Sequence, residues 1–188
     1  MSENKIFLHS CCGPCTMYPL EALRQEGFAV QGYFYNPNIH PYREFKARLD
    51  SYRQMAAAQD LPVQVEEDYG LAAFLGELQD KEPVVYRAKS ALRCQTCYRL
   101  RLEKAARACR QAGIKAFSTT LLVSPYQQHE LIKEAGEQAA AAAGVTFLYR
   151  DFRPGFRQGQ QKARALNLYM QGYCGCVFSE YERYGGKA

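Results

Sequence analysis

The stretch that most constrains this chain is Lys5-Ile-Phe-Leu-His-Ser-Cys-Cys-Gly-Pro-Cys15. Its first half, residues 5–9, is a short apolar run and predicts a buried strand. Residues 10–15 then form a tight turn, and residues 16–27 are expected to form a helix. Three thiols therefore follow the carboxyl end of a strand, where open α/β sheets bind ligands. The positive end of the helix favours thiolate over thiol, which suits metal ligands or nucleophiles.

Strand and helix patterns alternate along the rest of the chain. Further strands are expected at 30–35, 62–65, 115–120 and 145–149, and helices at 42–59, 71–79, 93–112, 129–143 and 160–171, with a turn at 36–41 and loops at 81–92, 121–128 and 151–159. This alternation predicts an α/β fold with a doubly wound, mostly parallel sheet. We expect a single domain over residues 1–188, because the length suits one sizeable core and no linker is visible.

The composition narrows the class of protein. No apolar run approaches the length of a membrane span, and the first residues lack the pattern of a secretory signal, so we expect a soluble, cytoplasmic protein without a membrane partner. Eight cysteines in such a protein favour metal or redox chemistry over a disulfide scaffold. The net charge of +5 is compatible with a nucleic-acid partner.

Seven of the eight cysteines fall into three clusters. These are Cys11, Cys12 and Cys15; Cys94 and Cys97; and Cys174 and Cys176. Loops that follow parallel strands converge on one edge of the sheet, so the clusters could meet there. The eighth, Cys109, lies among apolar residues of an expected helix and is predicted to be a core residue.

Three interpretations of the clusters compete. Cys11, Cys12, Cys94 and Cys97 could hold an iron–sulfur cluster, since adjacent cysteines can ligate different irons of one cube. Two C-x-x-C pairs, at 12–15 and 94–97, would also suit structural zinc. The Cys12-Gly-Pro-Cys15 motif could instead be a thioredoxin-like dithiol, although the usual tryptophan before it is missing.

The Cys174-Gly-Cys176 motif is a separate signal. Its two thiols are so close along the chain that a disulfide between them would be strained and easily reduced. That property suits a redox-active pair, and the alternative is a pair of metal ligands.

Taken together, the motifs resemble those of the cobalamin-independent epoxyqueuosine reductases, the QueH family, over nearly the whole chain. The resemblance rests on the motifs LHSCCGPC at 8–15, YNPNIHP at 35–41, CQTCYRLR at 94–101, STTLLVSPYQ at 118–127, DFR at 151–153 and YMQGYCGCVFS at 169–179. It implies the last step of queuosine biosynthesis, the reduction of epoxyqueuosine to queuosine in the anticodon loop of tRNA. It also implies an adenine-nucleotide-hydrolase-like (PP-loop) Rossmann fold, here without the phosphate motif and so without expected ATP use.

The same resemblance assigns roles to the cysteines. It places a 4Fe–4S cluster on Cys11, Cys12, Cys94 and Cys97 and a redox-active disulfide on Cys174 and Cys176. Cys15 could ligate a second, adjacent iron that acts as a Lewis acid on the epoxide oxygen, or could be a packed thiol. The implied partners are tRNA carrying epoxyqueuosine and an electron donor. The alternatives are a zinc-stabilised RNA-binding module and a general thiol–disulfide oxidoreductase.

Other polar residues are candidates for supporting roles. By side-chain type, the proton donors to the epoxide oxygen could be His9, His40, Tyr126 or Tyr173. Asp151 could anchor Arg153. The basic residues near the cysteine loops would neutralise anticodon-loop phosphates around a splayed-out base. They are Arg87, Lys89, Arg93, Arg99, Arg150, Arg153 and Arg157.

Overall fold

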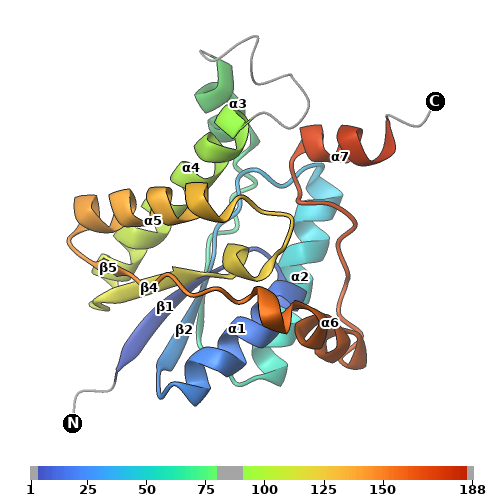
Figure 1. Ribbon diagram of the computed structural model, residues 1–188. Helices are drawn as coiled ribbons and strands as arrows, with labels where there is room; N and C mark the ends of the chain where they lie inside the picture. Colours follow the sequence, from blue (N-terminus) through green and yellow to red (C-terminus); the bar gives the residue numbers. More distant parts are fainter. Residues whose placement is uncertain (1–3, 80–90, 186–188) are drawn as a thin grey trace.

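The computed structural model describes residues 4–79 and 91–185 of the chain. Five parallel strands form one sheet in the order β3-β2-β1-β4-β5 (Figure 1). The strands are β1 Lys5–Ser10, β2 Ala29–Phe34, β3 Val63–Val65, β4 Ala116–Thr119 and β5 Thr146–Phe147. In the register of the central strand, Leu8 lies opposite Gly32 of β2 and Ser118 of β4. Every pairing is parallel, which confirms the predicted sheet.

The helices cover both faces of this sheet. They are α1 Gly13–Gln25, α2 Tyr42–Ala58, α3 Leu71–Gln79, α4 Ala91–Gln111, α5 His129–Ala143, α6 Phe156–Ala165 and α7 Val177–Tyr184, with 3-10 turns η2 Thr120–Val123 and η3 Arg153–Gly155. On one face α1 packs against α2 and α6, and on the other α4 packs against α5 (Figure 1). This arrangement confirms the predicted α/β fold class. None of the helices in the described part of the chain is long and apolar enough to span a membrane.

The central strand explains why the fold forms around the first stretch of the chain. Ile6, Phe7 and Leu8 are consecutive apolar residues and all are fully buried, as expected for a strand covered on both faces. The strand order reverses between β1 and β4, because the chain moves outward from β1 to β3 and then returns to the far side of β1. Ligands of such sheets bind at this reversal point, beyond the carboxyl ends of the strands.

The residues at this reversal point are close together. The backbone N–H of Cys11, just after β1, donates to the hydroxyl of Thr120, just after β4, at 3.1 Å. The α1 helix begins at Gly13, three residues earlier than predicted, and has Pro14 in its first turn. Proline is favoured there because its missing N–H has no helical partner to lose. The fold thus places the first cysteine cluster at its ligand-binding edge.

The predicted helix at 160–171 exists, but both of its bounds are wrong. The observed α6 begins at Phe156 and ends at Ala165, and Asn167 then turns the chain with a φ of 52°. Gly155 and Gly159 fall in the predicted loop at 151–159, but both allow α6 to approach α1: a Cβ at Gly155 would lie 2.2 Å from the ring of Tyr18.

Other boundaries differ less. The last strand, β5, has two residues where five are predicted, and η2 begins at the last residue of the predicted strand at 115–120 and continues into the predicted loop at 121–128. The α7 helix is not among the predicted elements. The predicted loop at 81–92 lies mostly outside the described residues, and its last two residues open α4.

Candidate redox and metal site

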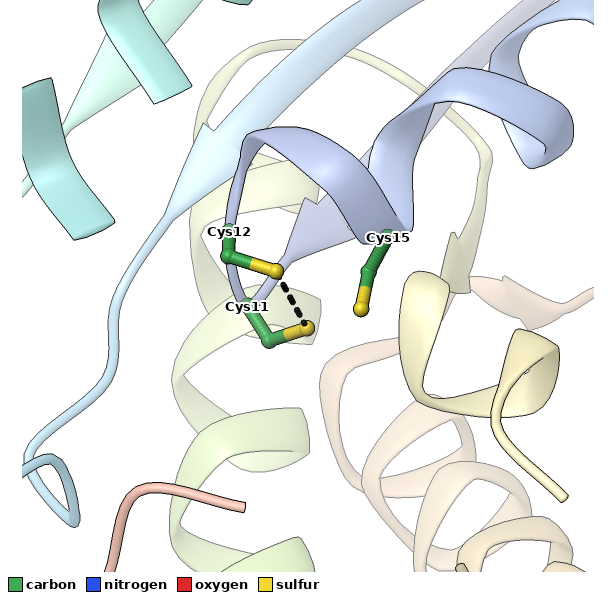
Figure 2. Close-up of side chains that lie close together, drawn as sticks. All are labelled: Cys11, Cys12 and Cys15. Carbon is green, nitrogen blue, oxygen red and sulfur yellow. Dashed lines mark hydrogen bonds between the residues drawn. The ribbon is translucent and has the colours of Figure 1, made fainter. Parts of the chain in front are cut away.

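Three buried thiols form the centre of the candidate site. Cys11 follows β1, Cys12 is the N-cap of α1, and Cys15 lies in the first turn of α1. Their exposed fractions are 9%, 0% and 6%, and their sulfur atoms all lie within 4.8 Å of one another (Figure 2). The Sγ atoms of Cys11 and Cys12 are 3.7 Å apart. We call these three residues the thiol triad.

The triad favours one thiolate and two thiols. Hydrogen bonds from the Cys12 and Cys15 thiols lower the pKa of Cys11 well below its usual value, and the charge of Arg101 acts in the same direction. Burial first, and then the neighbouring Cys11, raises the pKa of Cys12. The pKa of Cys15 is also raised, by its hydrogen bonds to the other two thiols. Cys11 is therefore the sulfur most ready to act as an anionic ligand.

Two polar side chains orient the triad from outside. The hydroxyl of Thr120 lies 3.5 Å from the Sγ of Cys11, and the amide Nε2 of Gln171 donates to the Sγ of Cys15 at 3.1 Å. Such hydrogen bonds to sulfur fix the direction of a ligand and tune the metal that it holds. Neither residue was among the predicted site residues.

The second cluster, Cys94 and Cys97, lies one helical turn apart near the start of α4, and both thiols are half-buried. Cys97 packs in a small apolar cluster around Cys176, and the guanidinium of Arg101 approaches its Sγ at 3.9 Å. Burial raises the pKa of Cys97 to about 11 and also raises that of Cys94.

The two clusters do not form one group of sulfurs within the described residues. The sulfurs that lie within 4.8 Å of one another are those of Cys11, Cys12 and Cys15. The ligand set of Cys11 and Cys12 with Cys94 and Cys97 therefore stays a prediction. The prediction for Cys109 is confirmed: it is fully buried, and its thiol donates to the backbone carbonyls of Ile114 and Ala116.

The third cluster is an open thiol pair. The Sγ atoms of Cys174 and Cys176 are 3.9 Å apart, with Cys174 exposed and Cys176 buried at the N-cap of α7. Gly175 between them has a φ of +115°, a conformation that other residues rarely adopt. The hydrogen bonds that join Cys174 to Cys176 and then to Ser179 lower the pKa of Cys174 to about 5, whereas the pKa of Cys176 is raised by its neighbour. The exposed member is thus the more nucleophilic thiol at neutral pH.

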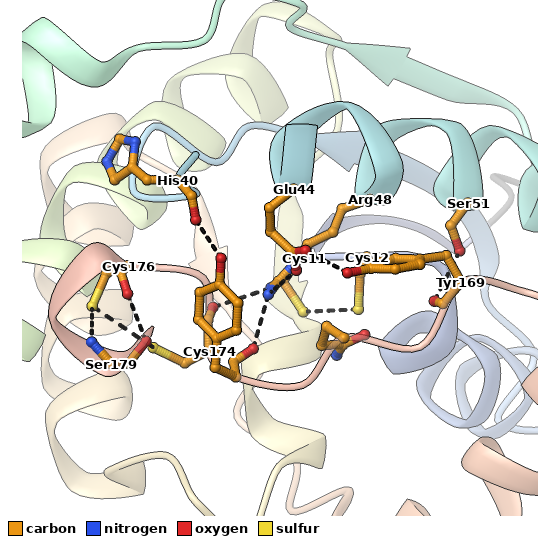
Figure 3. Close-up of polar contacts among 12 residues, drawn as sticks. Cys11, Cys12, His40, Glu44, Arg48, Ser51, Tyr169, Cys174, Cys176 and Ser179 are labelled. Carbon is orange, nitrogen blue, oxygen red and sulfur yellow. Dashed lines mark hydrogen bonds and ion pairs between the residues drawn. The ribbon is translucent and has the colours of Figure 1, made fainter. Parts of the chain in front are cut away.

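A buried ion pair on α2 fastens the thiol pair to the protein. Arg48, 1% exposed, pairs with Glu44 at 2.6 Å and donates to the carbonyls of Tyr173 at 2.8 Å and Cys174 at 3.1 Å (Figure 3). Its charge also acts on the Cys12 and Cys174 thiols. The triad and the thiol pair therefore lie near one shared guanidinium.

Further contacts anchor the same segment, residues 169–176, along α2. The carboxylate of Glu44 accepts from the hydroxyl of Tyr169, and Ser51 donates to the carbonyl of that tyrosine (Figure 3). At the other end the backbone N–H of His40 donates to the carbonyl of Gly175 at 2.8 Å. The 169–176 segment is therefore fixed at both ends beside the triad.

Replacing Arg48 with Met is expected to destabilise the protein by about 3–5 kcal/mol, because it leaves the buried carboxylate of Glu44 without its partner. The free energy of unfolding from urea titration of the metal-free protein measures this cost. The double variant Arg48→Met/Glu44→Met is the control, since removing both charges should recover most of the loss. A cost below about 1 kcal/mol for Arg48→Met would contradict the role of this ion pair.

Most of the predicted proton donors make hydrogen bonds that hold the fold together. The ring of His9 is fully buried between the hydroxyl of Thr119 and the carbonyl of Tyr35, and burial lowers its pKa to about 3. The hydroxyl of Tyr173 donates to the carbonyl of His40. Tyr126, in contrast, is 84% exposed, with its ring against Phe156.

The free energy of unfolding is expected to decrease at acidic pH because His40 becomes protonated. Its ring is 4% exposed and accepts or donates one hydrogen bond to Tyr69, and burial lowers its pKa from 6.5 to about 4. Between pH 4 and pH 6.5 this histidine binds more protons in the unfolded chain than in the folded protein. The contribution of the neutral ring to the free energy of unfolding is therefore complete above pH 6.5 and is lost as the pH falls towards 4. The loss reaches about 3 kcal/mol.

The measurement is urea unfolding across this pH range. The matched variant His40→Asn keeps a donor or acceptor near Tyr69 without a titrating ring. We expect the slope of its unfolding free energy against pH to be smaller than that of the wild type by the equivalent of about one bound proton. Parallel plots for the two proteins would show that His40 does not titrate in this way.

The basic residues have mixed roles. Arg87 and Lys89 lie outside the described residues. The predicted phosphate contact is wrong for Arg93, which is 3% exposed and pairs with Glu182 at 2.6 Å. Among the others, Arg99, Arg150 and Arg153 are partly or largely exposed but carry carboxylate partners, and Arg157 is exposed. Asp151 anchors Arg153 as predicted, and this contact lowers the pKa of Asp151 to about 2.

Comparison with known proteins shows which family this chain matches. A family model described as "Epoxyqueuosine reductase QueH" matches residues 6–182. A relative with the same description from Dehalococcoides mccartyi is 36% identical over 181 residues, which cover 96% of this chain and 95% of the relative. Another from Thermotoga maritima is 31% identical over 182 residues, covering 95% and 91%.

A solved structure supports the fold alone. The predicted subunit of a tRNA methyltransferase from Methanocaldococcus jannaschii superposes with a TM-score of 0.53 at 11% identity, over 85% of this chain and 74% of that one.

Proposed function

Because the chain belongs to the QueH family of epoxyqueuosine reductases, we propose that it reduces epoxyqueuosine to queuosine in the anticodon loop of tRNA. The observation that supports this reaction best is the presence of two different sulfur sites beside one buried guanidinium. The triad is enclosed and suits a metal group, whereas the thiol pair of Cys174 and Cys176 is open and unbridged.

The reaction removes the epoxide oxygen as water and leaves an alkene. It consumes two electrons and two protons. The thiol pair can supply both: oxidation of Cys174 and Cys176 to a disulfide releases two electrons and two protons, which balances the deoxygenation. An external electron donor then returns the disulfide to the dithiol. The Sγ–Sγ distance of 3.9 Å must shorten to about 2 Å to form the bond.

The chemistry of the donor set fits an iron–sulfur group. All candidate ligands are unbridged cysteine thiols, and soft thiolate ligands suit such clusters. The proposed 4Fe–4S ligands are Cys11, Cys12, Cys94 and Cys97, with Cys15 as a ligand of an adjacent iron. When bound, this group would supply single electrons and a Lewis acid for the epoxide oxygen.

The chain's own residues would prepare this site. The buried N-terminus of α1 and the hydroxyl of Thr120 favour the anionic form of Cys11. Gln171 orients Cys15, and Arg48 holds the 169–176 segment so that the thiol pair stays beside the triad. The thiol of Cys174 is exposed and can reach an incoming substrate, while Cys176 beneath it is shielded from water.

The proposed tRNA partner would approach over exposed side chains of the loops beyond β4 and β5. Tyr126 is 84% exposed and offers a ring on which an unstacked base could stack. The exposed Arg150, Arg153 and Arg157 would neutralise phosphates.

With three phosphate contacts, binding of the tRNA is expected to weaken about 20-fold between about 50 and 200 mM salt. Filter binding or fluorescence anisotropy with an anticodon stem-loop measures this slope. In the Arg157→Gln variant, the slope of log affinity against log salt concentration should be smaller by the contribution of about one phosphate contact. Equal affinity at both salt concentrations would argue against a phosphate-binding surface.

A single-turnover assay tests the proposed function. The protein is reconstituted anaerobically with iron and sulfide, reduced, and mixed with tRNA that carries epoxyqueuosine; nucleoside mass spectrometry then follows the loss of one oxygen atom. We expect brown protein and conversion of the modified base. Colourless protein that binds zinc, or a protein that only exchanges disulfides, would favour an RNA-binding module or a general oxidoreductase instead.

A further inference from the structure

Arg101 is a buried cation with no carboxylate partner among the described residues. Its exposed fraction is 3%, and it lies on α4 four residues after Cys97. One terminal nitrogen donates to the side-chain oxygen of Asn36 at 2.6 Å, and the other approaches the Sγ of Cys97 at 3.9 Å. The Nε atom is buried and has no hydrogen-bond partner in the part of the chain that the structure describes. No carboxylate of residues 4–79 or 91–185 lies within 4.0 Å of this guanidinium.

The contrast with Arg48 shows how unusual this is. Both side chains are almost fully buried, but Arg48 pairs with Glu44 and donates hydrogen bonds to two backbone carbonyls. A buried guanidinium cannot be neutralised by losing its proton, so it needs an anion nearby. For Arg101 the described residues offer only an amide oxygen and sulfur.

The groups that surround Arg101 are the candidate metal ligands. It contacts Cys97 of the second cluster directly, and its charge acts on Cys11 of the triad. Asn36, which accepts a hydrogen bond from Arg101 at 2.6 Å, itself donates to the carbonyl of Ser10 at 2.9 Å, just before the triad. Arg101 therefore lies between the two clusters that the proposed function assigns to one metal group.

We propose that Arg101 is the counter-cation of an anionic, thiolate-bound metal group held by Cys11, Cys12, Cys94 and Cys97. The inference rests on the proposed function, because the anion is the group that these thiolates would hold. Arg101 is a positioning residue: it compensates the negative charge of the group and donates hydrogen bonds to its sulfurs, including one from the Nε atom. Partners of this kind around a metal site usually contribute 10- to 100-fold to metal affinity.

The test compares metal-free and iron-loaded forms of Arg101→Met. In the metal-free form we expect the variant to be at least as stable as the wild type, because a buried unpaired charge is replaced by an apolar chain of similar length. In the loaded form we expect iron retention against a chelator to be about 10- to 100-fold weaker. We also expect the reduction potential to fall, because loss of a positive charge favours the oxidised group.

Two matched variants sharpen the test. Arg101→Lys keeps the charge and should recover part of the iron retention and of the potential. Arg107→Met removes an equal charge from the exposed face of the same helix, where the arginine is 64% exposed, and should change neither. The predicted loss of stability in metal-free Arg48→Met provides the contrast of a paired arginine.

The outcomes separate the two proposals. If Arg101→Met retains iron like the wild type, or loses stability equally in both forms, Arg101 only supports the Asn36 turn and the inference is wrong. If the wild type itself takes up no iron and sulfide, the proposed metal group fails and the inference fails with it.

Discussion

Iron and reductase activity are expected to disappear together when Cys11, Cys12, Cys94 or Cys97 is replaced by Ala. Each replacement removes one of four thiolate ligands, and a cluster with three protein ligands is open to solvent and to loss of iron. We expect anaerobically reconstituted variants to lose most of their visible absorption and iron. Iron and sulfide analysis with the single-turnover assay measures both losses.

Two controls use the chain's other buried thiols. Cys109→Ala removes a thiol that bonds only to backbone carbonyls in the core, so this variant should keep its iron. Cys15→Ala should keep the cluster but lose any adjacent iron. If Cys15→Ala instead loses the whole cluster while Cys94→Ala and Cys97→Ala retain full iron, the thiol triad is the ligand core and the predicted set is wrong.

Local sequence patterns predict the fold well as far as α5, because those elements follow simple periodicities. The helices at 42–58 and 129–143 show regular apolar spacing, and the strand at 5–10 contains the apolar run at 6–8. The part of the chain after α5 is different, because its structure depends on tertiary contacts. Gly155 and Gly159 look like helix breakers along the chain but are required for close packing of α6 on α1.

The cysteine clusters of the site are visible in the sequence, but their supporting residues are not. Arg48 and Arg101 look like surface charges, yet each lies on the apolar face of its helix: Arg48 between Phe45 and Leu49, and Arg101 between Tyr98 and Leu102. A charged residue on such a face was the available signal. Arg48 has its carboxylate partner Glu44 one helical turn away, but the carbonyls that it also binds belong to Tyr173 and Cys174, far along the chain. Arg93 shows the same effect, because its partner Glu182 is 89 residues away.

Turnover is expected to stop when Cys174 or Cys176 is replaced by Ser, while the iron remains. The serine hydroxyl preserves the size of the side chain and a hydrogen-bonding group near Ser179, but it cannot form a disulfide. Without the pair, the chain lacks its source of two electrons and two protons. We expect no detectable queuosine in a single turnover, with unchanged colour, iron content and tRNA affinity.

Direct detection of the disulfide completes this test. In the wild type, alkylation after one turnover should leave Cys174 and Cys176 protected, and reduction should expose both. Before turnover, Cys174 should react first and should still react well below pH 7, because its pKa is lowered to about 5, whereas the buried Cys176 should react slowly. The Ser179→Ala variant is a matched probe: it removes a hydroxyl that lies 2.9 Å from the Cys174 sulfur, so alkylation at low pH should slow while the iron stays. Loss of iron from Cys174→Ser would show that Cys174 and Cys176 are metal ligands. Full activity of either Ser variant would show that the thiol pair has only a structural role at the start of α7.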